Sequence, residues 1–174
     1  MNALSVLYLV LPLVGVFILH EAEELATASR WAKNRHQRNL EASPRLKLFL
    51  GRLYGADKKE MWVTAVEQLV VLAVITGYLL VGGSKSELVW IAAFLAYSVH
   101  SLLHIVRSLL VKGYFPGLVT AVLSLPFAGY GVYSISLAYP FRQIVSLAII
   151  GLSLSALNLM IVKYLLMTRK PANK

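Results

Sequence analysis

LVWIAAFLAYSVHSLLHIVRSLLV, residues 88–111, contains a single charged residue, Arg107. A helix needs about 20 apolar residues to cross roughly 30 Å of hydrocarbon, so this stretch predicts a membrane-spanning helix. Similar apolar stretches lie on both sides of it, at residues 3–28, 62–81, 115–137 and 142–167. We therefore predict an all-α fold: a polytopic membrane bundle of about five transmembrane helices.

The composition supports an integral membrane protein. Hydrophobic residues make up 58% of the 174 positions, and the mean hydropathy is +0.69. A soluble domain of this size is near half apolar and about a quarter charged. We expect one transmembrane helical domain over residues 1–174. The chain has no cysteine, so disulfides and thiolate metal sites are excluded, and any metal must bind nitrogen and oxygen atoms.

Basic residues predict the orientation in the membrane. Nine of them lie between the first two apolar stretches: Arg30, Lys33, Arg35, Arg38, Arg45, Lys47, Arg52, Lys58 and Lys59. Lysine and arginine near helix ends favour the cytoplasmic side, so we expect the N-terminus outside and the C-terminus in the cytoplasm. Leucine and aromatic residues interleave with these charges over residues 38–60, which predicts a basic amphipathic cytoplasmic loop lying on the headgroups. The net charge of +9 thus indicates anionic lipid as a partner, and not nucleic acid.

Ionisable residues interrupt the first apolar stretch at HEAEE, residues 20–24. On a helix, His20, Glu23 and Glu24 stand at i, i+3 and i+4 and share a face, whereas Glu21 is turned about 100° away. Charged side chains inside a membrane usually face the bundle interior and mark a functional path. We therefore expect three of the four side chains to converge.

The third apolar stretch carries a second polar face. His100 and His104 are one turn apart, and Tyr97 and Arg107 extend the same stripe. Glu67 and Asn158 are isolated polar residues in the second and fifth stretches. Counted from the basic ends, these groups and Glu24 lie about 8 to 16 Å deep, in one layer. A shared site in the inner half of the bilayer is the prediction.

Several carboxylates in one apolar layer repel one another, so a positive group should offset them. We predict one or two divalent metal ions, zinc or iron with manganese also suited, because histidine and carboxylate ligands fit these metals. The predicted ligands are His20, Glu24, Glu67, His100 and His104. The predicted catalytic bases are Glu23 and Glu24, and the predicted supporting residues are Tyr97, Arg107, Tyr114 and Asn158. The alternative is a metal-free network in which His and Glu share protons and fix helix register.

The chain resembles the HXXEE family of small bacterial multi-span membrane proteins. His20, Glu23 and Glu24 match H-x-x-E-E, and Tyr114-Phe115-Pro116-Gly117 is similar to the Y-x-P-G stretch of that family. The resemblance covers about residues 15–130 and includes the isolated Glu67 and the paired histidines. It implies a helical protein of the bacterial cytoplasmic membrane whose His and Glu motif is suspected of binding metal.

Two classes of function follow from this pattern. As an enzyme, a hydrolase or oxidoreductase, the protein would act on a lipid or amphipathic small molecule through metal-activated water or proton transfer. A metal-free isomerase would use the same histidines and glutamates for proton transfer. As an ion or proton transporter, the polar layer would be a midplane binding site. Enzyme is the favoured class, because the chain has no detectable repeat and few polar residues leading outward. An oligomer is compatible with the sequence.

Overall fold

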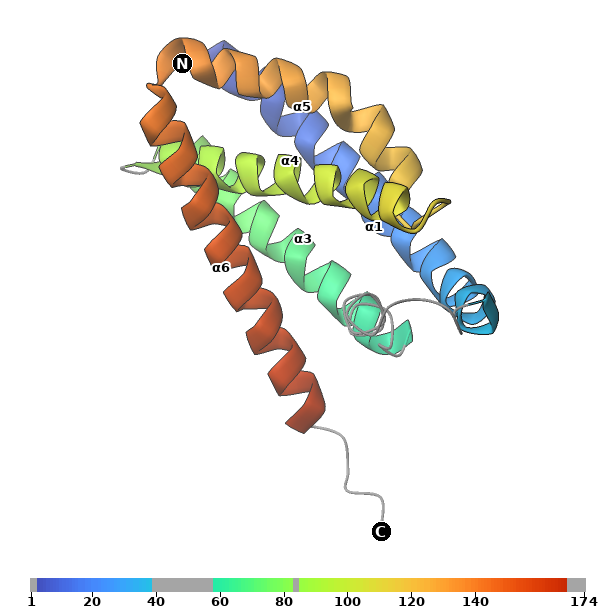
Figure 1. The fold of residues 1–174 in the computed structure, drawn as a ribbon. Coiled ribbons are helices and arrows are strands. Elements are labelled where there is room, and N and C mark those ends of the chain that lie inside the picture. The colour runs from blue at the N-terminus through green and yellow to red at the C-terminus, as the bar shows by residue number, and fades with distance from the viewer. Residues whose placement is uncertain (1–2, 39–57, 83–84, 169–174) are drawn as a thin grey trace.

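The computed structural model describes residues 3–82 and 85–168, apart from residues 39–57. It contains five helices: α1 (Ala3–Arg38), α3 (Lys58–Leu80), α4 (Ser86–Leu110), α5 (Leu118–Ala138) and α6 (Phe141–Thr168) (Figure 1). The described residues form no strand. The predicted all-α fold is confirmed. Most of the predicted amphipathic loop, including Arg45, Lys47 and Arg52, lies outside the described residues.

Four helices are long and apolar enough to cross a membrane: α3, α4, α5 and the part of α6 at Phe141–Leu166. Each coincides with one of the apolar stretches predicted to span. The remaining stretch forms the first part of α1, which continues as one helix to Arg38. At about 1.5 Å per residue, a helix of 36 residues is roughly 54 Å long and exceeds the bilayer core. That α1 also crosses the membrane, and the orientation of the bundle, stay predictions.

Helix α4 forms the centre of the bundle. It packs against α3, α5 and α6 and runs through the middle of the view in Figure 1. Its side chains Trp90, Ile91 and Phe94 are fully buried and form the main apolar core with Leu9 and Leu13 of α1. Most of the outer surface of α3 and α6 is exposed apolar side chain, as expected for helices that face lipid.

Two glycines allow the close packing around α4. A side chain at Gly131 of α5 would collide with the ring of Phe94, and one at Gly151 of α6 would collide with the carbonyl of Ala92. Small residues let helices in membranes approach closely, where dispersion forces replace the hydrophobic effect as the source of stability. The packing fixes the height of α4 relative to its neighbours, and thus the height of its histidines.

Helices α1 and α4 run in the same direction with polar side chains between them. Phe17 lies against Tyr97 with ring centroids 6.2 Å apart, and His20, one turn later, lies 5.3 Å from the ring of His100. The backbones of α1 and α4 are not among the closely packed pairs. The gap is therefore bridged by large side chains, which is the arrangement that a site between two helices requires.

Candidate metal centre

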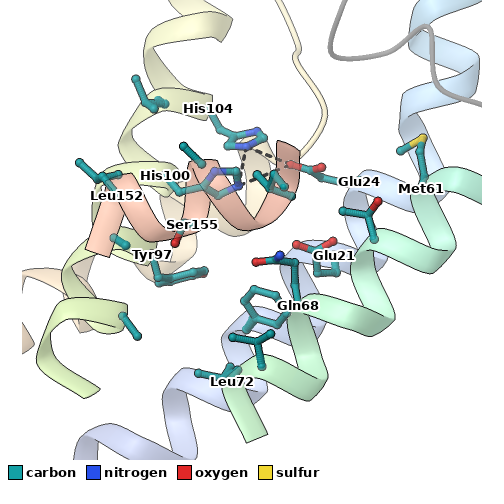
Figure 2. A pocket seen from close by; sticks show the side chains of 18 of the residues that line it. Glu21, Glu24, Met61, Gln68, Leu72, Tyr97, His100, His104, Leu152 and Ser155 are labelled. Atoms are coloured by element: carbon teal, nitrogen blue, oxygen red, sulfur yellow. Dashed lines mark hydrogen bonds and ion pairs between the residues drawn. The ribbon is translucent and has the colours of Figure 1, made fainter. Parts of the chain in front are cut away.

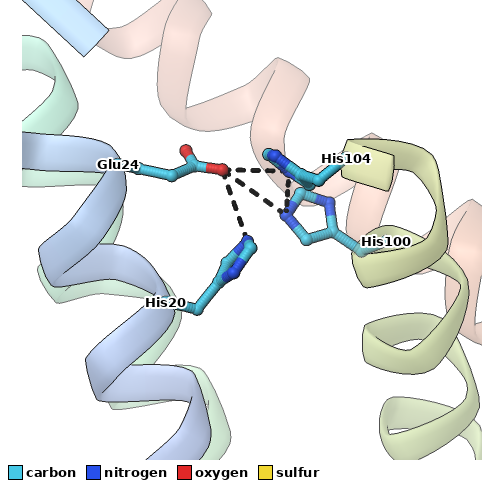
Figure 3. Close-up of side chains that lie close together, drawn as sticks. All are labelled: His20, Glu24, His100 and His104. Atoms are coloured by element: carbon cyan, nitrogen blue, oxygen red, sulfur yellow. Dashed lines mark hydrogen bonds and ion pairs between the residues drawn. The ribbon is translucent and has the colours of Figure 1, made fainter. Parts of the chain in front are cut away.

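Four side chains from α1 and α4 point at one another (Figure 3). Oε1 of Glu24 lies 2.9 Å from Nε2 of His104, 3.4 Å from Nε2 of His20 and 3.9 Å from Nε2 of His100. The Nε2 atoms of His100 and His104 are 3.0 Å apart. One potential ligand atom from each residue lies within 4.8 Å of all the others. We call these four residues the His/Glu cluster.

The helical periodicity explains why the cluster forms. His20 and Glu24 are one turn apart on α1, and His100 and His104 are one turn apart on α4, so each pair projects from a single face. The side chains of His20 and His104 are fully buried. The structure thus brings together four of the five predicted metal ligands, and leaves Glu67 outside.

The hydrogen bond of His104 fixes its tautomer. Nδ1 of His104 lies 2.7 Å from the carbonyl oxygen of Pro116. A carbonyl oxygen only accepts hydrogen bonds, so Nδ1 carries a proton. In the neutral ring, Nε2 is then the unprotonated nitrogen, and its lone pair is directed at Glu24. Histidines that bind metals are usually oriented by such a bond from the other ring nitrogen.

A second chain of hydrogen bonds fixes the tautomer of His20. Nδ1 of His20 lies 2.9 Å from Oγ1 of Thr120, and the hydroxyl of Thr120 lies 2.6 Å from Oε2 of Glu23. A hydroxyl has one proton, which goes to the carboxylate, so its oxygen accepts the Nδ1 proton of His20. The Nε2 lone pair of His20 therefore also faces the cluster.

Glu23 caps the start of α5 and does not face the cluster. Its two oxygens accept the backbone N–H groups of Val119, at 3.1 Å, and of Thr120, at 2.7 Å. The hydroxyl of Tyr114 donates to the same carboxylate at 2.7 Å. The first N–H groups of a helix lack partners within the helix and are usually capped by the residue before it. That residue is Gly117, which has no side chain, and Glu23 supplies the acceptor instead.

Gly117 is required by the histidines. Its φ is +82°, and a Cβ there would lie 2.7 Å from Nδ1 of His104 and 2.8 Å from Cε1 of His20. Glycine is the residue that adopts this left-handed conformation without strain. Two residues before it, Phe115 is fully buried and packs on Trp31 with ring centroids 4.9 Å apart. The Tyr-x-Pro-Gly stretch therefore packs directly against the histidines of the cluster.

Glu67, a predicted ligand, lies in a different polar contact. Its carboxylate accepts two hydrogen bonds from the amide of Asn158, at 3.0 and 3.1 Å, and a third from Gln68 at 2.8 Å. The contact joins α3 to α6. Glu67 and Asn158 do lie at one depth, as expected, but they meet each other and not the histidines, because their helices turn them toward one another.

A cavity of about 550 Å³ adjoins the cluster and is bounded by α1, α3, α4 and α6 (Figure 2). Glu24, His100 and His104 line it, whereas His20 closes the cluster from behind. The side chain of His100 is 42% accessible because it faces this space. The volume falls within the range of about 300 to 1,000 Å³ typical of small-molecule sites. The cluster therefore has one open side.

Three other residues of the predicted site lie in the wall of this cavity or against Glu23. Tyr97 and Arg107 line the cavity, and Tyr114 contacts Glu23. Glu21, expected to point away from the cluster, lines the same cavity as Glu24. Thr120 and Pro116 were not among the predicted site residues. The signal for Pro116 was its place in the Tyr-x-Pro-Gly stretch.

The donor set fits a transition metal. Zinc binds histidine nitrogen and carboxylate oxygen at about 2.0 to 2.2 Å, so tetrahedral ligand atoms lie about 3.4 Å apart. The distances within the His/Glu cluster, from 2.9 to 3.9 Å around Oε1 of Glu24, bracket that value. Among the residues that the structure describes, these four are the one group of this kind.

One protein family matches the part of the chain that contains this site. Residues 11–131 match the family described as proteins of unknown function with an HXXEE motif. No curated protein and no solved structure matches the chain. The matched region contains all four members of the cluster, the capping Glu23 and the Tyr-x-Pro-Gly stretch. Because the match covers more than half of the sequence, the chain belongs to the HXXEE-motif family.

Proposed function

We propose that this protein is a membrane-embedded metal-dependent enzyme. One divalent ion binds the His/Glu cluster, and the open side of the cluster presents it to an amphipathic molecule in the cavity. The observation that carries the proposal is the orientation of the two buried histidines. The Nδ1 protons of His20 and His104 are held by Thr120 and Pro116, so both Nε2 lone pairs face the carboxylate of Glu24.

This arrangement needs a positive charge at its centre. Nε2 of His104 and Oε1 of Glu24 are both electron-rich and lie 2.9 Å apart. Such a pair repels strongly in an apolar environment, where the effective dielectric constant is low. A divalent cation between the four residues converts the repulsion into attraction. Three histidines and one carboxylate suit zinc or iron, and an ion with six positions keeps sites for a substrate.

Bound metal would supply Lewis acidity, which polarises an oxygen of the substrate. The chain supplies the rest. His100, His104 and Glu24 would hold the ion at the side of the cavity, and the apolar helices around it would limit its contact with bulk water. Glu23, predicted as a base, accepts hydrogen bonds from Thr120 and Tyr114, so it acts on the ligands indirectly, by positioning His20.

The second candidate is a metal-free site. The separation of 2.9 Å between His104 and Glu24 also accommodates a protonated imidazole paired with a carboxylate. In that case the cluster moves protons, as an isomerase or a proton transporter would. The two candidates differ in a measurable quantity, the metal content of the protein.

The test is elemental analysis of the full chain, purified without chelators and after incubation with zinc or iron(II). The parent should carry one ion per chain. The double variant His100→Ala, His104→Ala and the single variant Glu24→Gln should lose it. His36→Ala, which removes the remaining histidine of the sequence, is the control and should keep it. A parent that carries no metal and cannot be loaded would replace the metal proposal by the proton-transfer one.

Transport is tested in the same preparation. Reconstituted into vesicles with a metal-sensitive dye inside, a transporter would move the ion across the bilayer at a rate that depends on His104. An enzyme would bind the ion without such flux. Flux abolished by His104→Ala would favour the transporter over the enzyme.

A further inference from the structure

The cavity beside the His/Glu cluster changes polarity along its length. On α4 the residues lining it run in order from Ala93 through Tyr97 and His100 to Arg107. On α3, which runs in the opposite direction, Glu60 lies at the charged end and Ile75 at the apolar end. Figure 2 shows the same order, with Leu72 at the far end of the cavity from Glu24.

The apolar end is built from all four surrounding helices. Leu13 and Phe17 of α1, Leu72 of α3, Ala93 of α4 and Leu152 of α6 line it. The seven residues from His100 back to Ala93 correspond to about 10 Å of helix, room for about eight methylenes of an extended chain. This end is therefore shaped for a single hydrocarbon chain of medium length.

The opposite end carries charges of both signs. Arg107 and Lys163 line it together with Glu60. Glu21 and Glu24 also line the cavity, in the layer of the cluster, where the divalent ion of the proposed function would offset them. Two cations against one carboxylate leave the outer end positive, which favours an acidic group there.

We infer that the cavity binds a single-chain amphiphile with an anionic head group, its chain at Leu72 and Leu152 and its head group beside Arg107 and Lys163. The bond presented to the His/Glu cluster is then the one next to the head group. The assignment of that bond and the preference for an anionic head group rest on the proposed function, because the metal ion offsets Glu21 and Glu24, whereas the binding of the chain does not. Carboxylate and phosphate head groups share the chemistry that two cations recognise, and the test includes both.

The test measures binding of radiolabelled octyl phosphate to the full chain in lipid nanodiscs, with empty nanodiscs as the correction for partitioning into lipid. Unlabelled alkyl phosphates and alkanoic acids of four to fourteen carbons compete for the site. Affinity should rise roughly fourfold per methylene up to about eight carbons, the length that the apolar wall allows, and then level off. Alkyl glucosides and alkyltrimethylammonium salts of equal length should compete more weakly.

Two variants test the two ends separately. Ala93→Leu fills the apolar end and should move the optimum to shorter chains. Its control is Ala73→Leu on the same bundle, an exposed residue of α3 that does not line the cavity. The double variant Arg107→Gln, Lys163→Gln should lose the preference for phosphate over glucoside and keep the chain-length profile.

Failure of this inference is distinguishable from failure of the metal proposal. The chain-length profile should persist in the metal-deficient variant His100→Ala, His104→Ala, because the apolar end contains no ligand. If the parent protein shows the chain-length profile but binds no metal, only the metal proposal is refuted. Metal binding with no saturable binding of amphiphile, with tighter binding of the cationic series, or with an unchanged optimum in Ala93→Leu, would overturn the present inference.

Discussion

Nδ1 of His104 lies 2.7 Å from the carbonyl oxygen of Pro116, so the chain just before α5 decides which nitrogen of this ring faces Glu24. Thr120, in the first turn of α5, does the same for His20. Both supports come from residues 116–120, which also form the start of α5. The orientation of the cluster and the formation of that helix end are therefore coupled.

Thr120→Val should lower metal affinity. Valine has nearly the shape of threonine but cannot accept the Nδ1 proton of His20 or donate to Glu23. Loss of a partner that orients a ligand typically costs about 10- to 100-fold in metal affinity. Competition with a metal-binding dye measures this change in detergent-solubilised protein.

Thr120→Ser keeps the hydroxyl and should recover most of the affinity. Ser136→Ala is the matched control, because the exposed hydroxyl of Ser136 donates to Tyr133 within its own helix. Equal affinity in Thr120→Val and the parent would show that the bond to His20 does not orient the ligand.

Gly117→Ala should damage folding and metal binding together. A Cβ at this position collides with His104 and His20, and the left-handed backbone costs a non-glycine residue about 1–2 kcal/mol. Thermal unfolding of the purified variant should begin at lower temperature, and metal content should fall. Gly129→Ala is the control, since nothing lies within 4 Å of a Cβ there. A variant at Gly117 with normal stability and metal would contradict the role given to this glycine.

The sequence predicted the cluster well because helical angles are local. His20 and Glu24, and His100 and His104, share faces by spacing alone, and the depth of each pair follows from the rise per residue. The apolar stretches predicted the helices for the same reason: each is long enough to cross a bilayer without help from the rest of the chain.

The sequence could not predict which way α3 and α6 are rotated. Depth placed Glu67 and Asn158 in the layer of the histidines, but rotation about the helix axis depends on packing with neighbours, and it turns the two residues toward each other. The Tyr-x-Pro-Gly stretch marked Pro116, but the hydrogen bond that its backbone carbonyl accepts from His104 could not be predicted from residue types. The sequence did not indicate that Glu23 caps α5, because Glu23 stands beside the ligand Glu24 and far from α5 along the chain.

Asn158→Leu should destabilise the bundle and leave metal content unchanged. The carboxylate of half-buried Glu67 then loses two hydrogen bonds from Asn158 and keeps the one from Gln68, so the cost should lie at the low end of the roughly 1–3 kcal/mol of an unsatisfied buried acceptor. Glu67→Gln, which keeps an acceptor for the amide, should have a smaller effect. Thermal unfolding and elemental analysis on the same samples measure both quantities. Metal loss in Glu67→Gln would return Glu67 to the set of ligands.

Substitution of the three carboxylates of HEAEE should have different effects on metal binding and on stability. Glu24→Gln removes the ligand at the centre of the cluster and should abolish metal binding. Glu23→Gln places an amide N–H₂ where the carboxylate accepts from Val119, Thr120 and Tyr114. It should therefore weaken the start of α5 and lower metal affinity through His20, without removing the ion at saturating metal. Glu21→Gln should keep both the metal and the stability, because Glu21 lines the cavity and is not part of the cluster.

Metal affinity and thermal stability, measured together, decide among these roles. Glu24→Gln should lose the ion at every metal concentration, whereas Glu23→Gln should recover it as the concentration rises. A missing ligand removes a bond to the ion. A missing orienting group leaves the histidine free to rotate, so it loses more conformational entropy when it binds the ion, and the affinity falls without loss of the site. If Glu23→Gln loses metal as completely as Glu24→Gln does, then Glu23 is a direct ligand, and the capping contact with α5 must break when metal binds.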